Sequence, residues 1–145
     1  MNLSEAFRHY GATLRNRLYD VSALTDTDPP ELVFAPFEHW PGCRWPGKHA
    51  DLPRNVCEYR DDLRLWGQSP AIPEVRRHMR LAHEQGLPVR LVLARLLDPE
   101  RDRGQVDAGQ NAQDVPKEFH VRPELVGRVT EFDGDAFCIR FERQA

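Results

Sequence analysis

Hydrophobic residues recur at helical spacing in two parts of the chain. Near the N-terminus, Leu3 and Phe7 begin a series that continues every three or four residues, and Asn2 with Glu5 has the layout of a capping box. This pattern predicts a helix of about 10 to 14 residues, a common helix length, that weakens or ends at Gly11.

The second helical pattern is the clearest element of the chain. Pro73 suits the first turn of a helix, and apolar residues then follow three and four positions apart. Gly86 stands where a helix often ends in a left-handed backbone conformation. We therefore predict a helix over 73–85.

Shorter runs in the rest of the chain are typical of strands. Residues 18–24 and 32–37 are β-prone and are separated by a cluster of turn formers, which predicts a hairpin. Residues 89–97 form a nearly continuous apolar run. Such a run is typical of a central strand that is buried on both faces.

The last part of the chain predicts a second hairpin. Three β-prone segments lie there, at 118–122, 125–132 and 135–143. Asp133-Gly134 is a strong signal for a two-residue turn, and such a turn places Phe132 opposite Asp135. In that register one face of the hairpin collects Val126, Phe132, Phe137, Ile139 and Phe141.

Two long segments show no lasting period. Residues 38–70 contain all three tryptophans and four prolines, and we expect an irregular loop there. The spacing of Tyr59, Leu63 and Trp66 predicts one short helix within it, over 58–66. Residues 98–117 are polar and contain two glycines, which predicts a mobile loop.

These elements together predict an α+β domain. A largely antiparallel sheet of about six strands, able to curl toward a barrel, packs with two main helices and a long Trp/Pro-rich loop. The chain has 145 residues, the size of one domain, and 35 of them are Leu, Ile, Val or Phe, enough for a core. We expect residues 1–145 to form a single domain.

Composition and charge exclude several classes of protein. The formal net charge is -3, with 20 basic and 23 acidic residues along the chain, so no global field attracts nucleic acid or an anionic membrane. No apolar run is long enough to span a bilayer, and the N-terminus lacks the pattern of a secretory signal. The three cysteines do not form a CxxC pair. We therefore expect a cytoplasmic protein with reduced thiols and no membrane association.

The candidate working surface lies within 38–70. Long loops are usually functional or disordered, and the tryptophans argue against disorder. Flat rings beside arginines can hold a base, a ring-bearing ligand or an extended peptide. The candidate ligand-binding residues are Trp40, Arg44, Trp45, Tyr59, Arg60, Arg64 and Trp66. In the alternative interpretation, these aromatic residues pack the loop against the sheet. The sequence favours an exposed, ligand-binding side chain for Trp45 and a packed side chain for Trp66.

The same segment contains four side chains that could bind a metal ion. They are His39, Cys43, His49 and Cys57, in the spacing H-x3-C-x5-H-x7-C. Zinc accepts imidazole and thiolate ligands, but this spacing lacks the close pairs of specific zinc motifs. These residues are weak candidates, and we expect neither a metal nor a cofactor.

No local signature of a common enzyme class occurs in the sequence. The leading hypothesis is a small non-catalytic binding module whose Trp/Arg surface binds nucleic acid or a nucleotide, including a modified one. An extended protein segment would fit almost as well. One alternative is an enzyme with a site assembled between 38–70 and the sheet. Another is an accessory subunit that works with a partner protein, and the sequence leaves the oligomeric state open.

Overall fold

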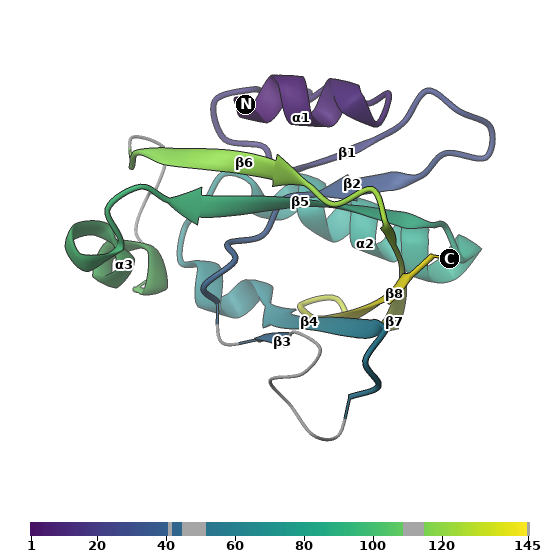
Figure 1. Ribbon diagram of the computed structural model, residues 1–145. Coiled ribbons are helices and arrows are strands. Elements are labelled where there is room, and N and C mark those ends of the chain that lie inside the picture. The colour runs from purple at the N-terminus through teal and green to yellow at the C-terminus, as the bar shows by residue number, and fades with distance from the viewer. Residues whose placement is uncertain (41, 45–51, 109–114, 145) are drawn as a thin grey trace.

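The structure is a computed structural model that describes residues 1–40, 42–44, 52–108 and 115–144. In chain order its elements are α1 (Leu3–His9), β1 (Ser22–Leu24), β2 (Leu32–Phe34), β3 (Cys43–Arg44), β4 (Val56–Asp62), a 3-10 turn η1 (Leu63–Trp66), α2 (Ile72–Gln85), β5 (Val89–Leu96), α3 (Pro99–Asp107), β6 (Lys117–Val121), β7 (Leu125–Phe132) and β8 (Ala136–Arg143). The strands form one curled sheet in the order β1-β2-β5-β7-β8-β4-β3, and β6 pairs with β5 beside this path (Figure 1).

The predicted α+β class with a largely antiparallel sheet is confirmed. Every pair of neighbouring strands is antiparallel except β2 and β5, which run parallel to each other. The expected hairpin of β1 and β2 and the buried strand β5 are both present. Among the described residues the sheet has eight strands rather than about six, because β3 and β4 lie in the segment that we expected to be irregular.

The prediction of a helix over 58–66 is wrong. Residues 58–62 belong to β4, and residues 63–66 form only the single 3-10 turn η1. Strand β4 pairs with β8 along its whole length, from Val56 opposite Glu142 to Asp62 opposite Ala136. Pairing with a strand so distant in the sequence outweighs the local spacing of aromatic residues that suggested a helix.

The two predicted helices are present with different lengths. Helix α2 begins one residue before Pro73 and ends at Gly86, whose φ of 63° is left-handed and whose N–H bonds to the carbonyl of Ala82. The side chain of Asn2 caps α1 by accepting the N–H of Glu5, but α1 ends at His9 and is shorter than expected. No described helix is long and apolar enough to cross a membrane.

The polar segment 98–117 is not a continuous loop. It contains helix α3, which Asp98 caps by accepting the N–H of Arg101, with Pro99 in the first turn. Asp102 is the one buried residue of this helix. An apolar stripe therefore could not indicate the helix, although the cap and the proline could.

The C-terminal hairpin exists, but its register differs from the prediction. Phe132 pairs with Phe137 rather than with Asp135, so the turn is two residues longer. The carboxylate of Asp133 stabilises this turn by accepting the N–H groups of Asp135 and Ala136. The register also shifts between Val129 and Glu131. Consequently Leu125 and Val129, not Val126, join Phe137, Ile139 and Phe141 in the core.

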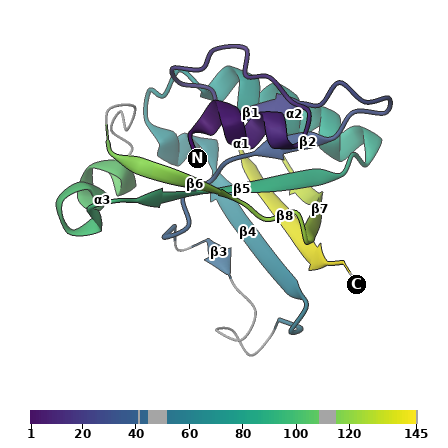
Figure 2. The same cartoon turned by 45° about the horizontal axis from the view of Figure 1, so that its top comes forward.

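Hydrophobic clusters lie on both faces of the sheet. Alternate residues of β2 point to opposite sides, so Leu32 and Phe34 join the cluster under α2, whereas Val33 joins the one under α1. Strand β5 divides its residues in the same way, with Leu91 on one side and Val92 on the other. Helices α1 and α2 thus cover different faces of the sheet, as Figure 2 shows. The curl leaves the end of β4 beside the tip of the β7–β8 hairpin.

Candidate functional site: an acidic cleft at the end of β4

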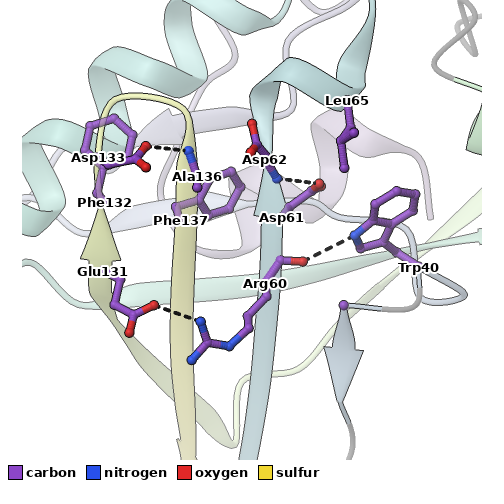
Figure 3. A pocket seen from close by; sticks show the side chains of 11 residues that line it. Trp40, Arg60, Asp61, Asp62, Leu65, Glu131, Phe132, Asp133, Ala136 and Phe137 are labelled. Carbon is purple, nitrogen blue, oxygen red and sulfur yellow. Dashed lines mark hydrogen bonds and ion pairs between the residues drawn. The ribbon is translucent and has the colours of Figure 1, made fainter.

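A cleft of about 610 Å³ lies between the end of β4 and the tip of the β7–β8 hairpin (Figure 3). Its apolar lining comprises Trp40, Leu65, Phe132 and Phe137. Its acidic lining comprises Asp61, Asp62, Glu131 and Asp133. Among the described lining residues Arg60 is the single basic one.

Trp40 is held against the edge of β4 by two contacts with the backbone of Arg60. Its indole Nε1 donates a 3.3 Å hydrogen bond to the carbonyl of Arg60, and the N–H of Arg60 donates to the carbonyl of Gly42. A Cβ atom at Gly42 would lie 1.8 Å from the carbonyl oxygen of Arg60. Glycine at this position therefore permits the close approach that brings Trp40 to the cleft.

Asp61 is the most enclosed carboxylate of the cleft. Its Oδ2 accepts hydrogen bonds from the hydroxyl of Tyr59 at 2.6 Å and the indole of Trp66 at 2.9 Å, and its Oδ1 accepts the N–H of Asp62. Burial raises the pKa of Asp61, while the three hydrogen bonds favour its ionised form and oppose that rise. The carboxyl group is consequently fixed in position by its neighbours.

Two other carboxylates remain ionised at neutral pH. The guanidinium of Arg64 lowers the pKa of Asp62 through a bidentate contact, in which Nε donates to Oδ1 and Nη2 donates to Oδ2. The N–H groups of Asp135 and Ala136 lower the pKa of Asp133. Asp133 forms no ion pair with the described residues, so its negative charge is available to a ligand.

The arginines near the cleft are already paired with carboxylates. Arg60 contacts Glu58 at 2.9 Å and Glu131 at 2.8 Å, and these contacts raise the pKa of its guanidinium. Arg44 contacts the same Glu58 at 3.1 Å. The positive charges expected to attract a phosphate are therefore largely neutralised within the protein.

The structure brings together only part of the predicted ligand-binding set. Trp40 and Arg60 line the cleft, and Trp66 lies behind it, partly buried against the core. Tyr59 is only 3% exposed and packs edge-to-face against Phe34, so it cannot stack on a ligand, contrary to the prediction. Arg44 and Arg64 are committed to the ion pairs described above, and Trp45 lies outside the described residues.

The weak metal candidates do not assemble in the described part of the chain. His39 pairs with Asp107 of α3 at 2.8 Å, whereas Cys57 is buried in the core. His49 and the side chain of Cys43 lie outside the described residues. No group of three or more His, Cys, Asp or Glu residues among those described could hold a metal ion.

Sequence reasoning missed the acidic wall of the cleft. Asp61 and Asp62 lie within the helix predicted over 58–66, but they are the last residues of β4. Glu131 and Asp133 were treated only as parts of the hairpin. The signal that could have identified them is the accumulation of carboxylates around the Asp133-Gly134 turn, which must lie at the end of two paired strands.

Comparisons with protein-family models, with curated proteins and with solved structures found no match to this chain. The chemistry of the cleft therefore carries the functional inference.

Proposed function

We propose that the protein is a small non-catalytic binding module whose acidic cleft holds a cationic side chain, arginine or lysine, of a partner protein. One observation carries this proposal. Four carboxylates line the cleft around its apolar floor, and two of them, Asp61 and Asp133, form no ion pair with the described residues. The single described basic lining residue, Arg60, is already paired with Glu131, which is another of the four. A cation with an aliphatic stem matches both the charge and the apolar floor.

The charge of the cleft separates this ligand from the nucleic acid or nucleotide of the initial hypothesis. A phosphate placed near Asp61 and Asp133 would meet like charges, and the neighbouring arginines are already neutralised. A guanidinium or ammonium group would instead be attracted and would also suit the face of Trp40. Nucleic-acid binding thus stays a prediction, and it becomes an outcome of the test below.

The edge of β4 favours recognition through side chains rather than through an added strand. The N–H and carbonyl of Arg60 are used by Gly42 and Trp40, and the N–H of Asp62 is used by Asp61. An incoming strand needs free backbone groups on the edge that it joins. The partner segment is therefore held by its projecting cation, which enters the cleft.

The test compares two short peptides that differ in charge alone. The probe is acetyl-Gly-Arg-Gly-amide, and its control is the same peptide with citrulline, which keeps the shape of arginine without its charge. Chemical-shift titration of the protein should show weak binding, with a Kd on the order of 1 mM, for the arginine peptide only. The shifts should concentrate at the cleft residues Trp40, Asp61 and Asp133.

Matched variants identify the carboxylate that acts. Asp133→Asn removes the charge of this side chain but keeps an oxygen that can accept the N–H groups of the turn. It should weaken binding of the arginine peptide at least about threefold without unfolding the protein. Glu84→Gln removes an exposed charge on α2, outside the cleft, and should leave binding unchanged. Equal binding of both peptides, or tighter binding of a single-stranded oligonucleotide at the same ionic strength, would overturn the proposal.

A second candidate is an enzyme that uses the same cleft, and the raised pKa of Asp61 favours it. A carboxyl group with a raised pKa can act as a general acid or base. Three hydrogen bonds occupy that carboxyl, however, which suits a fixed charge better than a mobile proton. Turnover abolished in Asp61→Asn but retained in Asp133→Asn would favour the enzyme.

We also keep a cytoplasmic location as a proposal, which rests on the cysteine pattern.

A further inference from the structure

A second groove with the opposite charge lies between α1 and the chain that follows it. Its volume is about 700 Å³, and its lining residues belong to α1 with its cap and to residues 12–18. Three of the lining residues are arginines, Arg8, Arg15 and Arg17, and none of those described is acidic. Helix α1 lies on the other side of the molecule from β3 and β4, so this groove is separate from the acidic cleft (Figures 1 and 2).

We propose that this basic groove binds a phosphate-bearing ligand. Phosphate groups are bound in proteins by arginine guanidinium groups together with hydroxyl and amide donors. The groove offers that combination, because Ser4, Thr13 and Asn16 line it beside the arginines. The proposal does not depend on the function of the acidic cleft.

Two of the arginines are available to a ligand. The side chains of Arg8 and Arg17 are exposed and form neither an ion pair nor a hydrogen bond with the described residues. The hydroxyls of Ser4 and Thr13 are likewise without a partner in the described part of the chain. This contrasts with Arg44, Arg60 and Arg64 around the acidic cleft, whose charges are paired.

The third arginine fixes the shape of the groove. Nε of Arg15 lies 3.5 Å from Oδ2 of Asp20 and 3.4 Å from Oε2 of Glu74. Asp20 is buried and accepts the N–H of Asn16 at 2.9 Å. These contacts tie the loop to α2, so the loop presents its free donors without first having to become ordered.

The groove is larger than a single phosphate group. Its volume is within the range of sites for small organic ligands. Leu14 and Leu18 contribute apolar lining, and Leu18 is 60% exposed. An organic phosphate ester could place its phosphate among the donors and its organic part on these leucines, whereas free phosphate would use the donors alone.

The first experiment titrates the wild-type protein with inorganic pyrophosphate at constant ionic strength. We expect amide shift changes at Thr13, Asn16 and Arg17, with a Kd on the order of 1 mM. The double variant Arg8→Gln/Arg17→Gln should bind at least about tenfold more weakly, because it removes both unpaired cations. Arg54→Gln, which changes an exposed arginine outside the groove, should bind like the wild type.

The outcomes separate the site from a general attraction of anions. An equal loss of affinity in Arg54→Gln and in the double variant, or shift changes spread evenly over exposed arginines, would overturn the proposal. So would the absence of shifts in the groove at about ten times the expected Kd. Because wild-type shift mapping needs no variant, the test holds even if a substitution disturbs folding.

A second titration identifies the source of the phosphate group. Phenyl phosphate and inorganic phosphate carry the same anionic group, but only the ester has an apolar part for Leu14 and Leu18. Tighter binding of phenyl phosphate supports an organic ester as the ligand, and equal binding of the two supports a free phosphate in the same site.

Discussion

The hydroxyl oxygen of Ser22 lies 2.7 Å from Nδ1 of His78, and both side chains are buried. The charged groups nearest the imidazole are Glu74 and Arg77 on its own helix and Arg15 from the preceding loop. Burial dominates over these charges and lowers the pKa of His78 to about 4. The fold therefore holds this histidine in its neutral form at pH 7.

The first prediction is a loss of stability in acid. The pKa of His78 is about 4 in the folded chain and about 6.5 in an unfolded one, so protonation favours unfolding. The contribution of the neutral His78 to the free energy of unfolding is fully present above about pH 6.5 and is lost as the pH falls toward 4. The total loss is about 3 kcal/mol. Urea unfolding of the wild type and of His78→Gln between pH 8 and pH 4 measures it.

The raised pKa of Asp61 changes stability in the direction opposite to His78. Protonation of Asp61 favours the folded chain, so it raises the free energy of unfolding in acid. The difference between the wild type and His78→Gln isolates the histidine from this effect. His83→Gln changes an exposed histidine of the same helix and serves as the matched control for the substitution itself. A wild type and His78→Gln with parallel pH profiles would contradict the assignment.

The second prediction concerns the absence of a side chain at Gly127. A Cβ atom there would lie 2.6 Å from Cδ1 of Phe141 and 3.1 Å from Cγ2 of Ile139, both fully buried. Gly127→Ala should therefore lower the free energy of unfolding by about 1–3 kcal/mol. Gly104 lies in α3, and a Cβ atom there would have no other atom within 4 Å. Gly104→Ala should therefore raise the free energy of unfolding by up to about 1 kcal/mol, because alanine has the higher helix propensity. Equal effects of the two substitutions, measured by urea unfolding, would refute the packing argument.

The third prediction is that Phe141 is critical for stability. Its side chain is 0% exposed and belongs to the core beneath α2. Phe141→Ala should cost about 3–5 kcal/mol and leave little folded protein at physiological temperature. Leu97→Ala removes apolar atoms from a residue that is 60% exposed, and its melting temperature should stay close to the wild type. Melting curves by circular dichroism decide between these outcomes, and wild-type melting of Phe141→Ala would contradict the core described above.

The fourth prediction tests how Asp61 is held. Tyr59→Phe removes a hydroxyl that donates to the ionised carboxylate, so the pKa of Asp61 should rise further. The lost hydrogen bond to a charged group should cost about 1.5–3 kcal/mol. Tyr10→Phe also loses partly buried hydrogen bonds, to the carbonyl of Leu91 and from the N–H of Arg122, and should leave the pKa of Asp61 unchanged. Carboxyl NMR titration measures the pKa, and an unchanged value in Tyr59→Phe would argue against the arrangement.

Local signals in the sequence predicted the elements that local forces determine. Asn2, Pro73 and Gly86 mark helix ends by capping chemistry that operates within a few residues, and the structure uses them in that way. The apolar run over 89–97 likewise indicates a buried strand, and β5 is buried in the structure. The hairpin turn was located correctly, but its length depends on Asp133 accepting two backbone N–H groups, which the dipeptide signal does not include.

The missed features depend on contacts between distant residues. Strand β4 forms because β8 pairs with it. The spacing of Tyr59, Leu63 and Trp66 indicates a helix only when this pairing is left out of account. The acidic cleft has the same origin, since one wall comes from β4 and the other from the hairpin tip. The neutralisation of Arg60 by Glu131 therefore could not be inferred from the neighbours of either residue in the chain.

The two walls of the acidic cleft also set the time at which it can form during synthesis. Arg60 and Glu131 are 71 positions apart, and Phe137 follows on β8. A ribosome that has released residues up to Asp62 has produced one wall but not the strand that orders it. A nascent chain therefore cannot present the completed cleft before β8 has emerged, so a partner that recognises the cleft would not bind a chain that stops short of β8.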